Sequence, residues 1–266
     1  MPFSLRQKGD IAWLEVDEFR REGVIAALST RQGGFSQGAF RSLNLGFSSG
    51  DDPNLVAGNR RLFFAALGIE ASEVVVADQV HGSRVLDITE EMRGHGATDR
   101  RDTVGEADAL VTGVPRTFLL EIFADCVPIL FADPSHRACA IAHSGWRGTA
   151  KGVGEEVVHH MAARFGSRPR DVLVAIGPSI APPSYEVGDE VRRAILERYP
   201  WAGAHLVGGQ ADLRAVIRGA LLRQGVVPER LTVSDHDTFQ DEDLFFSYRR
   251  DGPRSGRMAG VIGFDG

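Results

Sequence analysis

Short apolar runs of strand length recur along this chain, and longer segments with helical spacing lie between them. The runs are almost continuously hydrophobic, which is typical of strands that are covered on both faces. They span residues 24–28, 74–77, 109–111, 118–123, 127–132, 138–142, 172–176, 231–233 and 258–262. The pattern predicts buried strands distributed over most of the chain.

Four segments between these runs have the apolar spacing and the end signals of amphipathic helices. Asp52 before Pro53 is a helix cap followed by proline at the first helical position, and Gly68 and Gly166 are typical helix terminators. The segments span residues 53–67, 149–165, 189–199 and 211–224. Helices that alternate with buried strands predict an α/β fold.

The composition indicates one folded domain. The chain has 266 residues, of which 43% are hydrophobic, and this is enough for a sizeable core. No Gly/Ser-rich or Pro-rich linker, internal repeat or low-complexity tract divides it. We therefore expect a single domain over residues 1–266 that folds without a metal.

The charge pattern limits the kinds of molecule that the protein is expected to bind, and the cysteine count limits its disulfide bonds. The net charge of -6, without long like-charge runs, gives no footprint for nucleic acid or an anionic membrane and favours a small diffusible substrate. No apolar stretch approaches the roughly 20 residues of a membrane span, and no signal core begins the chain, so we expect a cytoplasmic protein. Cys126 and Cys139 are too few for a disulfide framework, and Cys139 lies in an apolar run that predicts inert core packing.

Three separate stretches each place one metal ligand beside a glycine or a bend. The ligands are His81, Cys126 and His143. Zinc takes imidazole and thiolate readily, and three protein ligands leave a fourth position open for water or substrate, as in catalytic sites. The ligands are 45 residues (81 to 126) and 17 residues (126 to 143) apart, so only a folded domain would bring them together.

The neighbours of these ligands favour a site. Taken alone, a lone cysteine is most often a buried small hydrophobe, and a histidine in a polar turn is often a surface residue. Asp125 and Pro128, however, do not suit the centre of an ordinary strand around Cys126. His143 stands at the carboxyl end of a predicted strand, where α/β sheets bind ligands, and Arg147 in the following turn could bind phosphate near a helix N-terminus.

The motifs around these residues resemble a known family over almost the whole chain. They span residues 30–34, 42–46, 50–53, 59–61, 79–82, 107–112, 124–128, 143–148, 176–178, 185–188 and 245–252. In them the chain resembles the laccase-domain proteins, also called polyphenol oxidases, whose members include zinc-dependent purine nucleoside phosphorylases and a peptidoglycan-editing factor. The resemblance implies that His81, Cys126 and His143 bind zinc, which copper could replace in vitro. It also implies a single-domain α/β sandwich with mixed sheets inside and helices outside, with a doubly wound parallel sheet as the alternative.

True laccase chemistry is not expected. A blue-copper site together with a trinuclear cluster needs many histidines, typically in His-x-His pairs. The chain has 8 histidines and no such pair. One three-ligand site cannot build four copper centres.

The resemblance implies instead phosphorolysis of adenosine, inosine and S-methyl-5'-thioadenosine, with hydrolytic deamination of adenosine as a second activity. Deamination needs a hydroxide nucleophile, which zinc with an open position favours by lowering the pKa of water to about 7. Asp125, which is adjacent to the ligand Cys126, could transfer the proton in deamination. Arg147 could bind the phosphate. Phosphorolysis needs a phosphate that is aligned at the ribose carbon. The candidate phosphate ligands are Arg31, Arg60, Arg147 and Arg249, and Asn44 is a candidate contact to sugar or base.

Two other classes of function stay open at this point, as does the oligomeric state. Cys126 and His143 could form a nucleophile–base pair that acts on an amide such as a peptidoglycan precursor. Such a pair has no need of His81 at the thiolate. The chain could also be a non-enzymatic zinc protein that binds a partner, against which the open coordination position argues.

Overall fold

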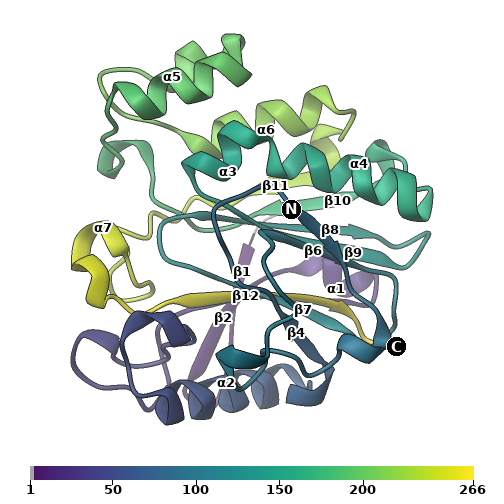
Figure 1. Cartoon of the computed structure of the whole chain (residues 1–266), viewed down its shortest axis with the longest axis vertical. Coiled ribbons are helices and arrows are strands. Elements are labelled where there is room, and N and C mark those ends of the chain that lie inside the picture. Colours follow the sequence, from purple (N-terminus) through teal and green to yellow (C-terminus); the bar gives the residue numbers. More distant parts are fainter. Residues whose placement is uncertain (1–2) are drawn as a thin grey trace.

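The structure is a computed structural model that describes residues 3–266, and it stacks two mixed sheets face to face (Figure 1). The first sheet has the order β1 (Phe3–Lys8), β2 (Ile11–Val16), β3 (Val24–Ser29), β12 (Met258–Phe264), β7 (Phe118–Phe123) and β4 (Val74–Val76). The second has the order β11 (Leu231–Val233), β10 (Leu173–Ile176), β8 (Val127–Asp133), β9 (Ala138–Ser144), β6 (Ala109–Thr112) and β5 (Val85–Asp87). Neighbouring strands are antiparallel except in the pairs β4–β7, β5–β6 and β10–β11. The expected α/β sandwich is confirmed, and the doubly wound alternative is wrong.

Helices lie on the outer faces of the two sheets (Figure 1). Helix α2 (Pro53–Leu67) covers the first sheet, while α3 (Trp146–Lys151), α4 (Val153–Phe165) and α6 (Leu213–Arg223) cover the second. Helix α5 (Asp189–Arg198) packs on α3, and α1 (Asp17–Arg21) and α7 (Tyr248–Asp251) are short. In the part of the chain that the structure describes, no helix is both long enough and apolar enough to cross a membrane.

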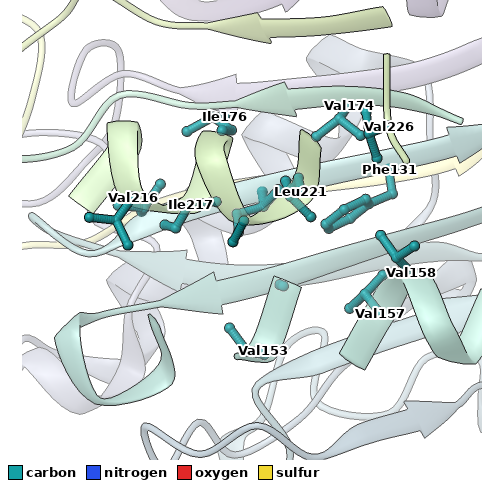
Figure 2. Packing of buried hydrophobic residues seen from close by; sticks show 14 of the residues in the cluster. Phe131, Val153, Val157, Val158, Val174, Ile176, Val216, Ile217, Leu221 and Val226 are labelled. Carbon is teal, nitrogen blue, oxygen red and sulfur yellow. The ribbon is translucent and has the colours of Figure 1, made fainter. Parts of the chain in front are cut away.

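Three hydrophobic clusters fill the layers between sheets and helices. In β9, Cys139 and Ile141 belong to the core between the sheets, whereas Ala140 and Ala142 belong to the core beneath the helices. Because both faces of such a strand are buried, its sequence is apolar without alternation. Figure 2 shows the helix side, where side chains of α4 and α6 gather around Phe131 of β8. Burial raises the pKa of the Cys139 thiol to about 12, as expected for an inert core cysteine.

The segment expected as one helix over residues 149–165 is two helices. Helix α3 begins at Trp146 and ends at Gly152, which has a φ of 78° and also starts α4. Glycine adopts this left-handed conformation at little cost, so the chain changes direction there. The helical spacing of apolar residues continues across Gly152. The hydrophobic pattern alone therefore did not reveal that one helix ends and another begins there.

The strand before α3 is longer than the sequence predicts. Strand β9 continues to Ser144 and pairs His143 with Pro128 of β8, so Gly145 alone separates it from α3, and Arg147 lies in that helix and not in a turn. Strands β1, β2 and β5 were not predicted. β1 lies at the edge of its sheet and carries mixed polar residues, which gives no continuous apolar run.

Candidate metal centre and cavity

The three predicted ligands meet where the two sheets adjoin. His81 follows β4 of the first sheet, Cys126 lies where the chain crosses from β7 in the first sheet to β8 in the second, and His143 is near the end of β9. Their ligand atoms all lie within 4.8 Å of one another. Such a group could hold a metal ion, and the fold assembles it from segments that are far apart in sequence.

The backbone around the ligands adopts conformations that ordinary residues rarely take. His81 has a φ of 58° and Asp125 a φ of 81°, both in the left-handed region. Non-glycine residues stay there only where the surroundings hold them, often at functional sites. At Gly145 a Cβ atom would lie 2.8 Å from the Sγ of Cys126, so a side chain is excluded beside the thiol.

Electrostatic contacts favour the ligand form of the cysteine. Burial alone would raise the pKa of the Cys126 thiol, but the charge and hydrogen bonds of His143 and His81 outweigh it and lower the pKa to about 6. The thiolate is the form that binds metal. The His143 ring, itself 5% exposed, keeps its Nδ1 3.0 Å from Oδ1 of Asp108, so the other ring nitrogen is the one that can ligate a metal. One sulfur and two imidazole donors, with a buried carboxylate behind one imidazole, fit a zinc-type ion.

The ligand group lies on the wall of a cavity of about 710 Å³. This volume is within the range of small-molecule binding sites. Both sheets and several loops contribute to the wall. Apolar and aromatic side chains form one part of it, namely Phe47, Val76, Ile122, Trp146, Tyr185, Val187, Val191 and Leu213, and arginines form another, namely Arg60, Arg100, Arg147, Arg249 and Arg257.

Arg147 and Arg249 are the two predicted phosphate ligands with exposed side chains in this cavity. The Arg147 guanidinium lies 4.2 Å from the Trp146 ring centre and makes no hydrogen bond or ion pair with any residue among 3–266. Arg249 donates one hydrogen bond from Nη1 to the carbonyl oxygen of Glu186 and lies 5.2 Å from the ring centre of Tyr185. Both therefore keep donors free toward the cavity.

Arg60 also lines the cavity, but it is buried and bound to the protein. Its Nε donates to the carbonyl oxygen of Leu45, and its Nη1 donates to those of Gly96 and Ala97. The guanidinium also stacks on Phe47 at 4.5 Å. These contacts give Arg60 a structural role in joining the loops on this side of the cavity.

The structure does not bring Arg31 and Asn44 to the cavity wall. Arg31 donates to the carbonyl oxygens of Arg41 and Glu242 and stacks on Phe246. Asn44 is fully buried, and its amide group is occupied. Its Nδ2 donates to Ser49 and Asp51, and its Oδ1 accepts from the backbone N–H groups of Gly46 and Arg257. Both residues organise loops, so neither has the geometry of the substrate contact that the sequence indicated.

Arg257 and Tyr185 are two wall residues for which sequence reasoning proposed no role. Arg257 donates from Nη1 to the carbonyl oxygens of Ser255 and Gly256, and Asn44 holds its backbone. Tyr185 has no hydrogen bond from its hydroxyl to any described residue, and burial together with the nearby Cys126 thiolate raises its pKa to about 12. The motif at residues 185–188 could have pointed to the tyrosine, whereas nothing in the sequence places Arg257.

Comparisons with known proteins point to one family. A model of the family described as multi-copper polyphenol oxidoreductase laccase matches residues 25–265. The chain is 39% identical over 257 residues to purine nucleoside phosphorylase YlmD of Geobacillus stearothermophilus, with 94% of each chain covered. It is also 39% identical over 245 residues to purine nucleoside phosphorylase YfiH of Escherichia coli, covering 91% of this chain and 94% of that protein.

Solved structures of relatives share the fold. The crystal structure of YlmD from Geobacillus stearothermophilus aligns over 100% of both chains with a TM-score of 0.93 and 37% identity. That of the hypothetical protein YfiH from Bacillus licheniformis aligns over 98% of both chains with a TM-score of 0.92 and 34% identity. The chain therefore belongs to the multi-copper polyphenol oxidoreductase laccase family.

Proposed function

We propose that this protein is a zinc-dependent purine nucleoside phosphorylase of the cytoplasm that acts on adenosine, inosine and S-methyl-5'-thioadenosine. Deamination of adenosine is its second activity. The observation that carries the proposal is the group of His81, Cys126 and His143 on the wall of a cavity that also presents Arg147, whose guanidinium has no hydrogen-bond or ion-pair partner among residues 3–266. The names of the curated relatives support the same reaction.

The residues of the metal centre have a defined task in this proposal. Zinc, when bound by His81, Cys126 and His143, would supply a Lewis acid with one open coordination position. Copper could take the same ligands in vitro. In residues 3–266 no second group of three or more potential ligands accompanies this one, so a laccase-type set of copper centres has no place in the described chain.

The arginines and Tyr185 serve phosphorolysis. Arg147 and Arg249 bind and orient phosphate, since their free donors face the cavity and guanidinium matches phosphate geometry. The departing purine needs a proton at its ring nitrogen, and the Tyr185 hydroxyl, which lines the cavity and has no hydrogen-bond partner among the described residues, is its donor. The apolar side chains around it exclude water from the base.

The hydrolase alternative is not favoured. A nucleophile–base pair needs only Cys126 and His143. It does not explain why the ligand atom of His81 also lies within 4.8 Å of the other two. The curated relatives are named as phosphorylases.

A nucleoside assay with and without phosphate tests the proposal. Purified metal-loaded protein should release adenine from adenosine only when phosphate is present, whereas inosine should form from adenosine without it. The difference follows from two nucleophiles, phosphate at the sugar and activated water at the ring. Equal base release without phosphate would replace phosphorolysis by simple hydrolysis, and no turnover of any nucleoside would overturn the proposal.

A further inference from the structure

Asp108 makes contact with two of the three ligand segments at once. Its side chain is fully buried, and the residue directly precedes β6. The carboxylate accepts hydrogen bonds from the backbone N–H groups of Val80 at 3.1 Å, His81 at 2.9 Å and Gly82 at 2.6 Å. Its Oδ1 also lies 3.0 Å from Nδ1 of His143. We propose that Asp108 is the positioning residue of the metal centre and holds both histidines in their binding geometry.

The backbone of the His81 turn depends on this carboxylate. Three successive N–H groups that converge on one anion form a concave nest, and such nests are stable when an anion fills them. His81 has a φ of 58°, a conformation that costs free energy unless its surroundings stabilise it. Because the three amides bind Asp108, the turn keeps this conformation, and the exposed His81 ring is presented toward Cys126 and His143.

The same carboxylate sets the chemistry of the His143 ring. A carboxylate acceptor at Nδ1 keeps the proton on that nitrogen and leaves Nε2 with the lone pair that a metal needs. The backbone N–H of His143 also donates to the carbonyl oxygen of Asp108 at 2.9 Å, so ring and main chain are both held. One residue outside the ligand set therefore orients two ligands, one in the turn after β4 and one in β9.

A second aspartate in the chain offers a matched control. Asp133 is also fully buried, and its carboxylate also accepts from turn amides, those of Ser135 at 3.0 Å and His136 at 3.4 Å, and lies 2.7 Å from Nδ1 of His136. Neither Asp133 nor His136 lines the cavity. Asp133 therefore reproduces the carboxylate, turn and histidine arrangement without the metal centre.

Metal affinity of the metal-free protein, measured by competition with a chromophoric zinc chelator, is the decisive readout. Asp108→Asn keeps the shape of the side chain. It replaces one carboxylate oxygen by an amide N–H₂ group, which then faces an N–H donor that the carboxylate accepts from in the wild type. Loss of one such outer partner typically weakens metal binding about 10- to 100-fold, and the double role predicts the upper end. Asp133→Asn should leave affinity within twofold of the wild type, even if both variants melt at a lower temperature. An Asp108→Asn affinity within twofold of the wild type would overturn the proposal.

Two further variants keep the test decisive. If Asp108→Asn does not fold, Gly82→Ala replaces it, because its added Cβ would lie 3.2 Å from Oδ2 of Asp108 and would displace the carboxylate without removing it. We expect a several-fold loss of zinc affinity, and unchanged affinity would overturn the proposal. The loss of zinc affinity caused by Asp108→Asn should also be smaller in a His81→Ala background, because that variant already lacks the histidine ring that Asp108 positions through the His81 turn. Equal effects in both backgrounds would overturn the double role.

Discussion

The backbone N–H of Arg249 donates a hydrogen bond to Oδ2 of Asp125 at 2.6 Å, which ties the start of α7 to the turn that carries Cys126. The other carboxylate oxygen accepts from the Thr238 hydroxyl at 2.7 Å. Both oxygens are therefore engaged by the C-terminal segment. The sequence indicated Asp125 as a proton carrier, whereas these contacts favour a role in positioning the Cys126 turn and Arg249 on the same wall.

Two substitutions of Asp125 distinguish these roles. In Asp125→Asn the amide oxygen can still accept from Arg249 while the amide nitrogen donates to the rotated Thr238 hydroxyl, so we expect the protein to keep most of its stability and deaminase activity. Asp125→Ala leaves the Arg249 N–H without its partner and should lower the free energy of unfolding by about 1–3 kcal/mol. Calorimetry and a deaminase assay measure both. Equal loss of deamination in the two variants would restore the proton-transfer role.

Removal of the thiol tests the ligand assignment. Cys126→Ala should lose most of its zinc, because two histidines alone bind the ion weakly, while the hydrophobic cores keep the protein folded. The control is Cys139→Ala, which removes the other cysteine from the core between the sheets and should keep its zinc. Metal analysis and circular dichroism check both variants. Full zinc content in Cys126→Ala would reject this residue as a ligand.

Arg147 should act on phosphate and not on the metal. Arg147→Ala loses one charge-assisted contact of about 1.5–3 kcal/mol, roughly tenfold to a hundredfold in affinity. We expect a higher KM for phosphate in phosphorolysis, with little change in deamination and full zinc content. Arg147→Lys should give an intermediate KM, and Arg21→Ala, an exposed residue of α1, should change nothing. If both reactions suffered equally, Arg147 would be a structural support of the His143 turn.

Tyr185 should matter only where the leaving base needs a proton. Tyr185→Phe should lower kcat for inosine on the order of 100-fold, since a positioned acid contributes at least that much. The 7-methylated nucleoside 7-methylguanosine already carries a positive charge on its base, so its phosphorolysis should change little. Steady-state kinetics with both substrates make the comparison. A similar loss for both would leave Tyr185 with a role in shaping the cavity only.

Glu121 gives the fold a pH dependence of known sign. It lies on β7 with 2% exposure, neither carboxylate oxygen has a hydrogen-bond partner among the described residues, and burial raises its pKa well above the usual range. The folded state then holds a proton that the unfolded state releases above a pH of about 4.3. The contribution of Glu121 to stability is therefore largest below this pH and falls as pH rises toward the folded pKa, by about 1.4 kcal/mol per unit.

Glu121→Gln removes this slope. In metal-free protein, denaturant unfolding at pH 5 and pH 8 should show the variant gaining stability relative to the wild type as pH rises. Glu229→Gln, an exposed site, is the control and should follow the wild type. A constant difference between Glu121→Gln and the wild type across this range would mean that Glu121 is charged in the folded protein.

The sequence by itself determined the class of fold and singled out the three candidate metal ligands. Thiolate and imidazole chemistry together with the family resemblance pointed to His81, Cys126 and His143, and continuous apolar runs identified strands with two buried faces. Local end signals were equally direct. Asp52 caps α2 through the N–H of Asn54, and Gly68 ends the helix with a φ of 76°, as the sequence predicts.

Only the tertiary structure decided which polar residues reach the site. Arg31, Asn44, Arg60 and Arg147 all lie in motifs of equal weight. Distant backbone carbonyl and N–H groups engage the first three, whereas the Arg147 guanidinium in the cavity has no polar partner among the described residues. Asp108 lies in the motif at residues 107–112, but nothing in the sequence assigned it a role. Its role arises because folding places a buried carboxylate against amides 26 to 28 residues before it and a ring 35 residues after it. Hydrogen bonds between such distant segments depend on the packing of the two sheets, which no local pattern encodes.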